Sequence, residues 1–392
     1  MMRGAFFLIL LVCIFFVGKT GEIDSTSNSF IFPPQAKHVH GSTLVALPNG
    51  DLLAAWFYGS GERKADDVCI MGARKRKGAK EWTQPFLMAD TRDLPDCNPV
   101  LFLNQRQELF LVWIAVQANR WEHAVLRCKK SSNYNDLAAP EWSWQDNILL
   151  KPDSSFVTEM KSKFKDLPER KATWAAYAPD YDALILEAGE DLSKRSFGWM
   201  TRIKPLLLKG DTVLLPLYSD GLNLSLIAHS DDGGDHWRPS LPIVGRGNIQ
   251  PSLIQRNNGD LLAYMRDNGD APSRTQISIS KDRGATWTAA EKTNLLSTAS
   301  VEVLRLHDGR WLMVANDIDD GRYRLALFVS TDEGESWEKI KNLEEDLRKK
   351  QSFSYPALIQ SEDGEVHVSY SFKTADGLET IKYLSFSSDH IN

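Results

Sequence analysis

The sequence predicts an all-β protein, a six-bladed β-propeller, and two internal repeats that run in step carry this prediction. The first repeat is the pattern Ser-x-Asp-x-Gly-x-x-Trp, called the Asp box below, at residues 230–237, 280–287 and 330–337. Its aspartate can accept hydrogen bonds from the backbone of its own loop, its glycine permits a turn with positive φ, and its tryptophan fills space between strands. Each Asp box is therefore predicted to be a hairpin turn.

The second repeat is a polar turn followed by an apolar strand, and it occurs six times. Its copies span residues 48–56, 104–113, 208–218, 257–266, 307–316 and 362–370. Several copies open with Asn-Gly or Asp-Gly, which favour hairpin turns. Because another apolar segment precedes most copies, each unit is interpreted as four strands, and six such units of about 50 residues are typical of a propeller.

Two segments depart from the repeats. Residues 151–200 have mixed charge and no repeat signal, so they are predicted to be an insertion between blades 2 and 3, either a lid over the central site or a solvated excursion. Helical periodicity is nearly absent elsewhere, and the best candidate, residues 343–350, is predicted to be a short surface helix. The propeller is expected to occupy residues 30–392.

The first residues predict export from the cytoplasm. An apolar run at residues 5–18 follows Arg3 and has the length and charge order of a signal-peptide core. Residues 1–21 are therefore predicted to be a signal peptide, which places the mature protein outside the cell or in the periplasm. An uncleaved anchor is the alternative.

Composition excludes several functions. A net charge of −6 argues against a nucleic-acid partner, which requires a basic face. Apart from Cys13, the cysteines Cys69, Cys97 and Cys128 match no zinc pattern and allow at most one disulfide. No metal or cofactor is predicted, no membrane contact beyond the signal segment is expected, and a monomer is predicted because a closed propeller leaves few sheet edges to cover.

The repeat topology brings particular residues to one rim of the ring. If the first strand of each blade starts at the central face, then the ends of second strands and the starts of third strands share that face. The residues predicted to lie there are His40, Asp66, Asp67, Lys204, Tyr218, Gln250, Arg266, Ser300, Asn316, Arg322, Arg324 and Tyr355. Such a gathering of cations favours an anionic ligand, because arginine offers a planar fork to a carboxylate. The alternative is structural: arginines paired with nearby carboxylates, and a packed Tyr355.

Together these features resemble the sialidase (neuraminidase) superfamily, particularly its bacterial Asp-box (BNR) repeat proteins, over residues 36–390. The resemblance implies that Tyr355 is the nucleophile, that Arg266 and Arg322 bind the substrate carboxylate, and that Asp67 lies near the position of the catalytic acid. Lys204 is a further predicted substrate-binding residue. Two positions depart from the family: His40 stands where it has its first arginine, and Gln250 stands where it has the glutamate that assists the tyrosine.

These departures bear on the predicted catalytic set of Tyr355, Asp67, His40 and Gln250. Tyrosine has a pKa near 10 and needs a base or a strong positive potential to react at neutral pH, and glutamine cannot take its proton. Glu302, Asp317 or His40 could replace the glutamate, or the tyrosine has another role.

Three functions follow. The first is a sialidase-like exo-glycosidase that hydrolyses a terminal acidic sugar from a glycan. The second is a polysaccharide lyase that acts on a uronic-acid glycan, with His40 or Tyr355 as its base. The third is a non-catalytic glycan-binding propeller.

Overall fold

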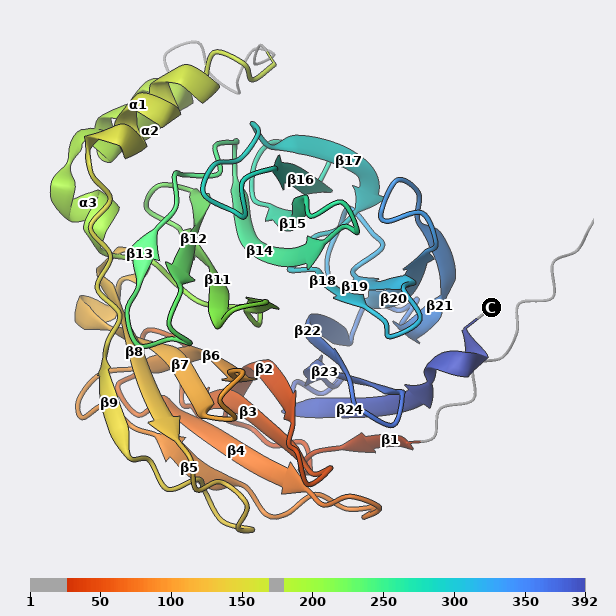
Figure 1. The fold of residues 1–392 in the computed structure, drawn as a ribbon. Coiled ribbons are helices and arrows are strands. Elements are labelled where there is room, and N and C mark those ends of the chain that lie inside the picture. Colours follow the sequence, from red (N-terminus) through yellow and green to blue (C-terminus); the bar gives the residue numbers. More distant parts are fainter. Residues whose placement is uncertain (1–26, 169–179, 392) are drawn as a thin grey trace, which may run out of the picture.

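The protein is a ring of six four-stranded antiparallel sheets, as seen in a computed structural model that describes residues 27–168 and 180–391 (Figure 1). This confirms the predicted six-bladed β-propeller. The first strands of neighbouring sheets contact one another and therefore lie nearest the axis. The predicted signal peptide, residues 1–21, lies outside the described residues.

The strands of the first three blades follow the order of the sequence. Blade 1 contains β2 (His38–Ala46), β3 (Leu52–Gly59), β4 (Cys69–Lys75) and β5 (Phe86–Ala89). Blade 2 contains β6 (Asp96–Leu103), β7 (Leu109–Val116), β8 (Ala124–Ser131) and β9 (Trp144–Asn147), with the short 3-10 helices η1 (Gln117–Asn119) and η2 (Trp121–His123) between β7 and β8. Blade 3 contains β10 (Leu206–Leu208), β11 (Thr212–Ser219), β12 (Leu224–Ser230) and β13 (Arg238–Pro239).

The last blade closes the ring with a strand from the other end of the chain. Blade 4 contains β14 (Asn248–Gln255), β15 (Leu261–Asp267), β16 (Arg274–Ser280) and β17 (Glu291–Leu296), and blade 5 contains β18 (Glu302–Arg305), β19 (Trp311–Ala315), β20 (Arg324–Ser330) and β21 (Glu338–Glu345). Blade 6 contains β22 (Ser352–Gln360), β23 (Glu365–Lys373) and β24 (Glu379–Ser387), followed by the 3-10 helix η3 (Ser388–His390). Its outer strand is β1 (Ser27–Phe30), which pairs with β24 in the register Ser27↔Ser385 (Figure 1).

The Asp boxes form the turns that the sequence predicts. In the second box, Asp282 Oδ1 accepts hydrogen bonds from Ser280 Oγ at 2.8 Å and from the Thr286 amide at 2.9 Å. In the first box, the Gly233 amide donates to the Asp211 carbonyl in the turn between β10 and β11. Box turns and first-hairpin turns therefore share one face, which leaves the starts of the first strands on the opposite face.

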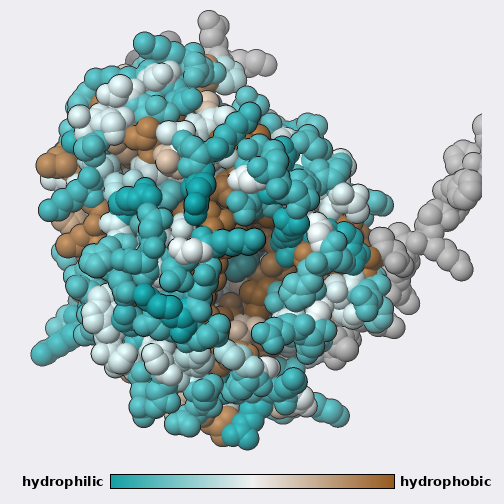
Figure 2. Space-filling view, in the orientation of Figure 1, coloured by the Kyte–Doolittle hydropathy of each residue, from teal (hydrophilic) through white to brown (hydrophobic). Residues whose placement is uncertain are grey.

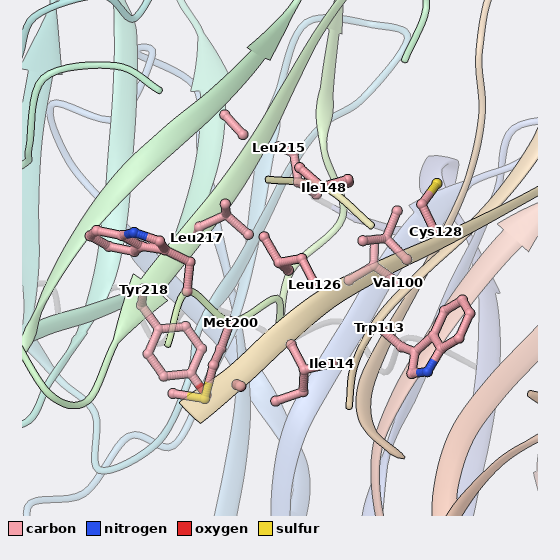
Figure 3. Close-up of a cluster of buried hydrophobic side chains, with 14 of the residues drawn as sticks. Val100, Trp113, Ile114, Leu126, Cys128, Ile148, Met200, Leu215, Leu217 and Tyr218 are labelled. Atoms are coloured by element: carbon pink, nitrogen blue, oxygen red, sulfur yellow. The ribbon is translucent and has the colours of Figure 1, made fainter. Parts of the chain in front are cut away.

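Apolar side chains fill the space between blades. Figure 3 shows one such cluster, in which Ile114 and Leu126 of blade 2 lie near Leu215 and Leu217 of blade 3. All four side chains are buried. This packing anchors Tyr218, at the end of β11, by its ring.

Three helices occur in the segment predicted to be an insertion. They are α1 (Ser154–Lys163), α2 (Tyr181–Glu190) and α3 (Leu192–Ser196), and they lie at the outer edge of the ring (Figure 1). Asp182 of α2 forms an ion pair with Arg246, which lies between β13 and β14, at 2.8 Å. None of the described residues between 151 and 200 lines the axial cavity.

The helix expected at residues 343–350 is wrong. Residues 338–345 are strand β21, which pairs with β20, and residues after it form a turn. The carboxylate of Asp346 accepts hydrogen bonds from the amides of Lys350 and Gln351, and these bonds hold the chain in a turn. Pairing with a neighbouring strand decided the conformation here, as it often does for short segments of mixed polarity.

Two further features concern covalent and membrane chemistry. The three cysteines in the described part of the chain, Cys69, Cys97 and Cys128, are all free. No helix among residues 27–168 and 180–391 is long and apolar enough to cross a bilayer.

Candidate active site

Four of the innermost strands carry the same backbone irregularity at the axis. In β2, β6, β14 and β22 the register shifts at a β-bulge that contains Gly41, Asn98, Gln250 and Tyr355, respectively. All four residues have positive φ, with values of 64°, 51°, 56° and 57° in the same order. Three of them are not glycine, and such strained backbone is found preferentially at functional sites.

The bulges surround a cavity of about 380 Å³ on the axis. This volume is typical of a site for a small ligand. The face of the ring seen in Figure 2 is mostly hydrophilic around a central hollow. Six of the residues predicted for the rim line the cavity: His40, Tyr218, Gln250, Arg266, Arg322 and Tyr355.

A hydrogen-bonded chain crosses the floor of the cavity. Gln250 Nε2 lies 3.3 Å from the hydroxyl oxygens of both Tyr218 and Tyr355. Asn98 Nδ2 donates to Tyr218 Oη at 3.2 Å, and Arg266 Nη1 donates to Tyr355 Oη at 3.4 Å. Gln250 Oε1 is buried and has no hydrogen-bond partner among the described residues. Such an orphaned acceptor is costly unless a ligand satisfies it.

Positive charge surrounds Tyr355. Burial alone would raise the pKa of Tyr355, but the charges of Arg266 and Arg322 and the hydrogen bond from Gln250 outweigh it and lower the pKa below its ordinary value. The Arg322 guanidinium lies 5.2 Å from the centroid of the Tyr355 ring, and Arg202 lies 4.7 Å from it. The tyrosine therefore occupies the environment that favours its ionised form.

His40 stacks on the same tyrosine. The two rings are 4.1 Å apart between centroids with an interplanar angle of 29°. Burial and the nearby charges of Arg322, His38 and Arg202 lower the pKa of His40 well below its usual value. The imidazole is therefore neutral at physiological pH, and it does not replace the positive charge of the arginine that the family has at this position.

The guanidinium groups of Arg266 and Arg322 form no ion pair within the described residues. Within the residues that the structure describes, no carboxylate lies within 4.0 Å of either guanidinium. Arg322 makes only a long hydrogen bond, 3.4 Å, to Ser354 Oγ. Two unpaired arginines that line one cavity are suited to bind an anionic group.

The structure places two predicted site residues away from the cavity. Asp67 pairs with Lys37 at 3.2 Å and accepts hydrogen bonds from Ser60, and these hydrogen bonds lower its pKa to about 2. Lys204 pairs with Glu302 beside the start of blade 5. Neither residue lines the axial cavity, and each is held by a partner that does not line it either.

The other candidate bases and rim residues are also accounted for. Asp317 pairs with Lys339 at 2.5 Å, and Glu302 pairs with Lys204, so both carboxylates that could have replaced the missing glutamate are already neutralised by lysines outside the cavity. Arg324 pairs with Glu345 at 2.8 Å. The remaining predicted rim residues that do not line the cavity are Asp66, Ser300 and Asn316.

Sequence reasoning missed several residues of the site. The cavity is also lined by Glu62 in the β3–β4 loop, by Asn98, by Trp121 of η2 and by Asp220 in the β11–β12 turn. Asn98 carried a usable signal: it precedes Pro99 at the same place in its blade as Gln250 precedes Pro251 and Tyr355 precedes Pro356. In the described part of the chain no group of three His, Cys, Asp or Glu side chains could hold a metal ion.

The chain is a six-bladed ring with Asp-box turns and an arginine-lined axial cavity beside a buried tyrosine. The model of the BNR repeat-like domain matches residues 50–368, and the chain belongs to this family. A search of curated proteins finds no significant match.

Solved structures show the same fold at low sequence identity. A protein of unknown function from Dyadobacter fermentans is 17% identical, with 93% of this chain and 98% of that chain covered and a TM-score of 0.66. A leech intramolecular trans-sialidase complexed with 2,7-anhydro-Neu5Ac is 13% identical, with 94% and 71% covered and a TM-score of 0.66. An intramolecular trans-sialidase from Ruminococcus gnavus in complex with oseltamivir carboxylate is 12% identical, with 95% and 98% covered and a TM-score of 0.64.

Proposed function

We propose that the protein is a sialidase-like glycoside hydrolase that removes a terminal acidic sugar, sialic acid or a related sugar, from glycans. The observation that carries this proposal is the pair of unpaired arginines, Arg266 and Arg322, that lines the axial cavity beside Tyr355. A carboxylate on the sugar would complete this arrangement, because charge-assisted hydrogen bonds to arginine are strong and directional. Sialidase structures among the neighbours support the substrate class.

Each residue then has a defined role. Arg266 and Arg322 hold the sugar carboxylate and so place the anomeric carbon above Tyr355. The Tyr355 oxygen attacks that carbon, the bond to the aglycone oxygen breaks, and the leaving oxygen takes a proton from an acid. Water then displaces the tyrosine from the covalent intermediate, with retention of configuration.

We assign the acid role to Glu62 rather than to Asp67. An acid with a pKa of about 2 is ionised at neutral pH and has no proton to donate, which is the situation of Asp67. Glu62 lies on the same β3–β4 loop, and its side chain lines the cavity. Asp220 also lines the cavity, and burial raises its pKa, with smaller contributions from the charges of Glu122 and Glu62.

The experiment compares two substrates in Glu62→Gln, Asp220→Asn and Asp67→Asn. One substrate is an alkyl-linked sialoside, whose leaving group needs a proton, and the other is a nitrophenyl sialoside, whose leaving group does not. Glu62→Gln should lose about 100-fold or more on the first and much less on the second, while Asp67→Asn should match the parent on both. Equal losses on both substrates for Glu62→Gln, or the selective loss in Asp220→Asn, would overturn the assignment. Release of no acidic sugar from either substrate would refute hydrolysis itself.

A second candidate function is β-elimination from a uronic-acid glycan. The observation that favours it is the neutral imidazole of His40 stacked on Tyr355, since a neutral histidine is able to take a proton. This reaction creates a conjugated double bond, so near-ultraviolet absorbance on incubation with a uronic-acid glycan tests it. An unchanged spectrum would remove this candidate.

A further inference from the structure

Arg202 lies below the cavity, and the sequence pattern did not single it out. It belongs to the segment between α3 and β10, and only 2% of its surface is exposed. Its guanidinium carbon lies 4.7 Å from the centroid of the Tyr355 ring. Arg202 does not line the cavity, so the tyrosine separates it from any bound ligand.

The hydrogen bonds of Arg202 fix its position and are made to backbone carbonyls, not to a carboxylate. Its Nη1 and Nη2 donate to the carbonyl oxygens of Ser42 at 3.3 Å and Pro356 at 2.9 Å, which belong to the bulged strands β2 and β22. Its Nε is buried without a partner, and no carboxylate in the described part of the chain lies within ion-pair distance. A guanidinium does not deprotonate in proteins, and a buried charge without a counter-charge is costly. The charge of Glu302, which is itself paired with Lys204, and after it a charge on Tyr355 favour the ionised form of Arg202.

We propose that Arg202 is a positioning residue that holds Tyr355 as its phenolate, in place of the carboxylate base that the site lacks. This proposal gives the buried charge its partner and explains how the tyrosine is activated beside a glutamine. It deepens the proposed function and rests on it for the identity of the reaction, although the ionisation of Tyr355 stands apart from any substrate.

A bound substrate makes the role of Arg202 specific. Arg266 and Arg322 both lower the pKa of Tyr355 in the free protein, against the opposing effect of burial. A substrate carboxylate held by these two arginines would neutralise their effect at the moment when the nucleophile is needed. Arg202 is out of reach of the substrate, so its positive charge continues to act on the tyrosine oxygen.

The charged and titratable groups around Tyr355 come from several elements. The imidazole of His40 on β2 is neutral, and the hydroxyl of Tyr218 on β11 is held in its neutral form, because burial and the charge of Asp220 raise its pKa well above the ordinary value. A charged Glu62 on the β3–β4 loop would oppose ionisation of Tyr355. The charges of Arg266 and Arg322 favour it. Arg202 lies over the tyrosine ring, and the carboxylate of Glu302 acts on Arg202.

Proton and electron balance are simple in this scheme. The Tyr355 proton leaves to solvent before the substrate binds. The phenolate oxygen then supplies the electron pair for the new bond to the anomeric carbon, and the electron pair of the broken bond leaves with the aglycone oxygen, which is protonated by the acid. No oxidant, reductant or further reactant is required.

The test is a titration of the intact protein followed by the near-ultraviolet absorbance of tyrosinate, without substrate. The parent should show one of its ten tyrosines ionising before the others, and Tyr355→Phe should lack that step. In Arg202→Met the midpoint of this step should rise by about 1 to 3 pH units, the effect of losing an opposite charge at this separation. Arg202→Lys should restore part of the shift, and Arg324→Met, which removes a guanidinium already paired with Glu345, should leave the midpoint unchanged.

An unchanged midpoint in folded Arg202→Met, or the absence of an early step in the parent, would overturn the proposal. If Arg202→Met does not fold, Arg202→Lys provides the comparison. Lysine keeps the positive charge but lacks the planar guanidinium, so the midpoint should rise by less than in Arg202→Met. The titration uses no sugar, so a protein that shows the early Tyr355 step but releases no acidic sugar would refute the proposed function and leave this inference standing.

Discussion

Replacement of Arg322 provides the sharpest test of the anionic site. Arg322 and Arg324 are two residues apart, at the start of the same strand region in blade 5, and differ in one respect. Arg324 is bound to Glu345 at 2.8 Å, whereas Arg322 lines the cavity, lies over the Tyr355 ring and makes one long hydrogen bond to Ser354. The variants Arg322→Met and Arg324→Met therefore remove the same group from two neighbouring places.

The expected magnitudes differ widely. A charge-assisted contact to a carboxylate contributes about 1.5–3 kcal/mol, which is a loss of roughly 10- to 150-fold in affinity for Arg322→Met. Arg324→Met breaks a partly exposed ion pair, which costs at most about 1 kcal/mol of stability and leaves affinity unchanged.

The assay is calorimetric binding of free N-acetylneuraminate and of a uronic acid, with a neutral hexose as the reference ligand. Arg322→Met should weaken binding of the acidic sugars and leave the neutral sugar unaffected. Equal affinities in Arg322→Met and Arg324→Met would show that the cavity does not recognise a carboxylate, and the reasoning from unpaired arginines would fail.

Two further predictions concern the scaffold. Asp282→Ala should lower the free energy of unfolding, measured in urea, by about 1–3 kcal/mol, because Asp282 accepts hydrogen bonds from the Thr286 amide and hydroxyl. The affinity for sugar should stay at the parent value. A loss of affinity without a loss of stability would contradict this prediction. Burial lowers the pKa of His367 to about 4, and its ring nitrogens contact Ser361 and Tyr383 at 2.8 Å. The unfolded chain then binds a proton that the folded chain excludes, so the free energy of unfolding should fall as pH drops from about 6.5 to about 4. This dependence on pH should be shallower in His367→Gln. Parallel plots of stability against pH for the two proteins would exclude this histidine as the cause.

The sequence could predict the arginines and the tyrosine because each occupies a fixed place in a repeated unit. Arg266 ends a strand that opens with Asn-Gly, and Tyr355 precedes a proline at the start of another, so the repeat alone assigns both to one rim. The same reasoning was too coarse for Asp67, which lies five residues beyond Glu62 on one loop. A loop has no periodicity, and only the structure shows that Glu62 lines the cavity while Asp67 is held by Ser60 and Lys37.

Repetition in the chain by itself determined the number of blades, the face that holds the site and the cationic character of that site, because turn chemistry and strand alternation are local properties. The tertiary structure alone decided that β1 completes the last blade, that residues 343–345 extend a strand instead of starting a helix, and that Arg202 lies against Tyr355. The first and the last of these contacts join residues 358 and 153 positions apart, and the second depends on pairing with a neighbouring strand. Side chains that meet only after the ring closes leave no pattern along the chain.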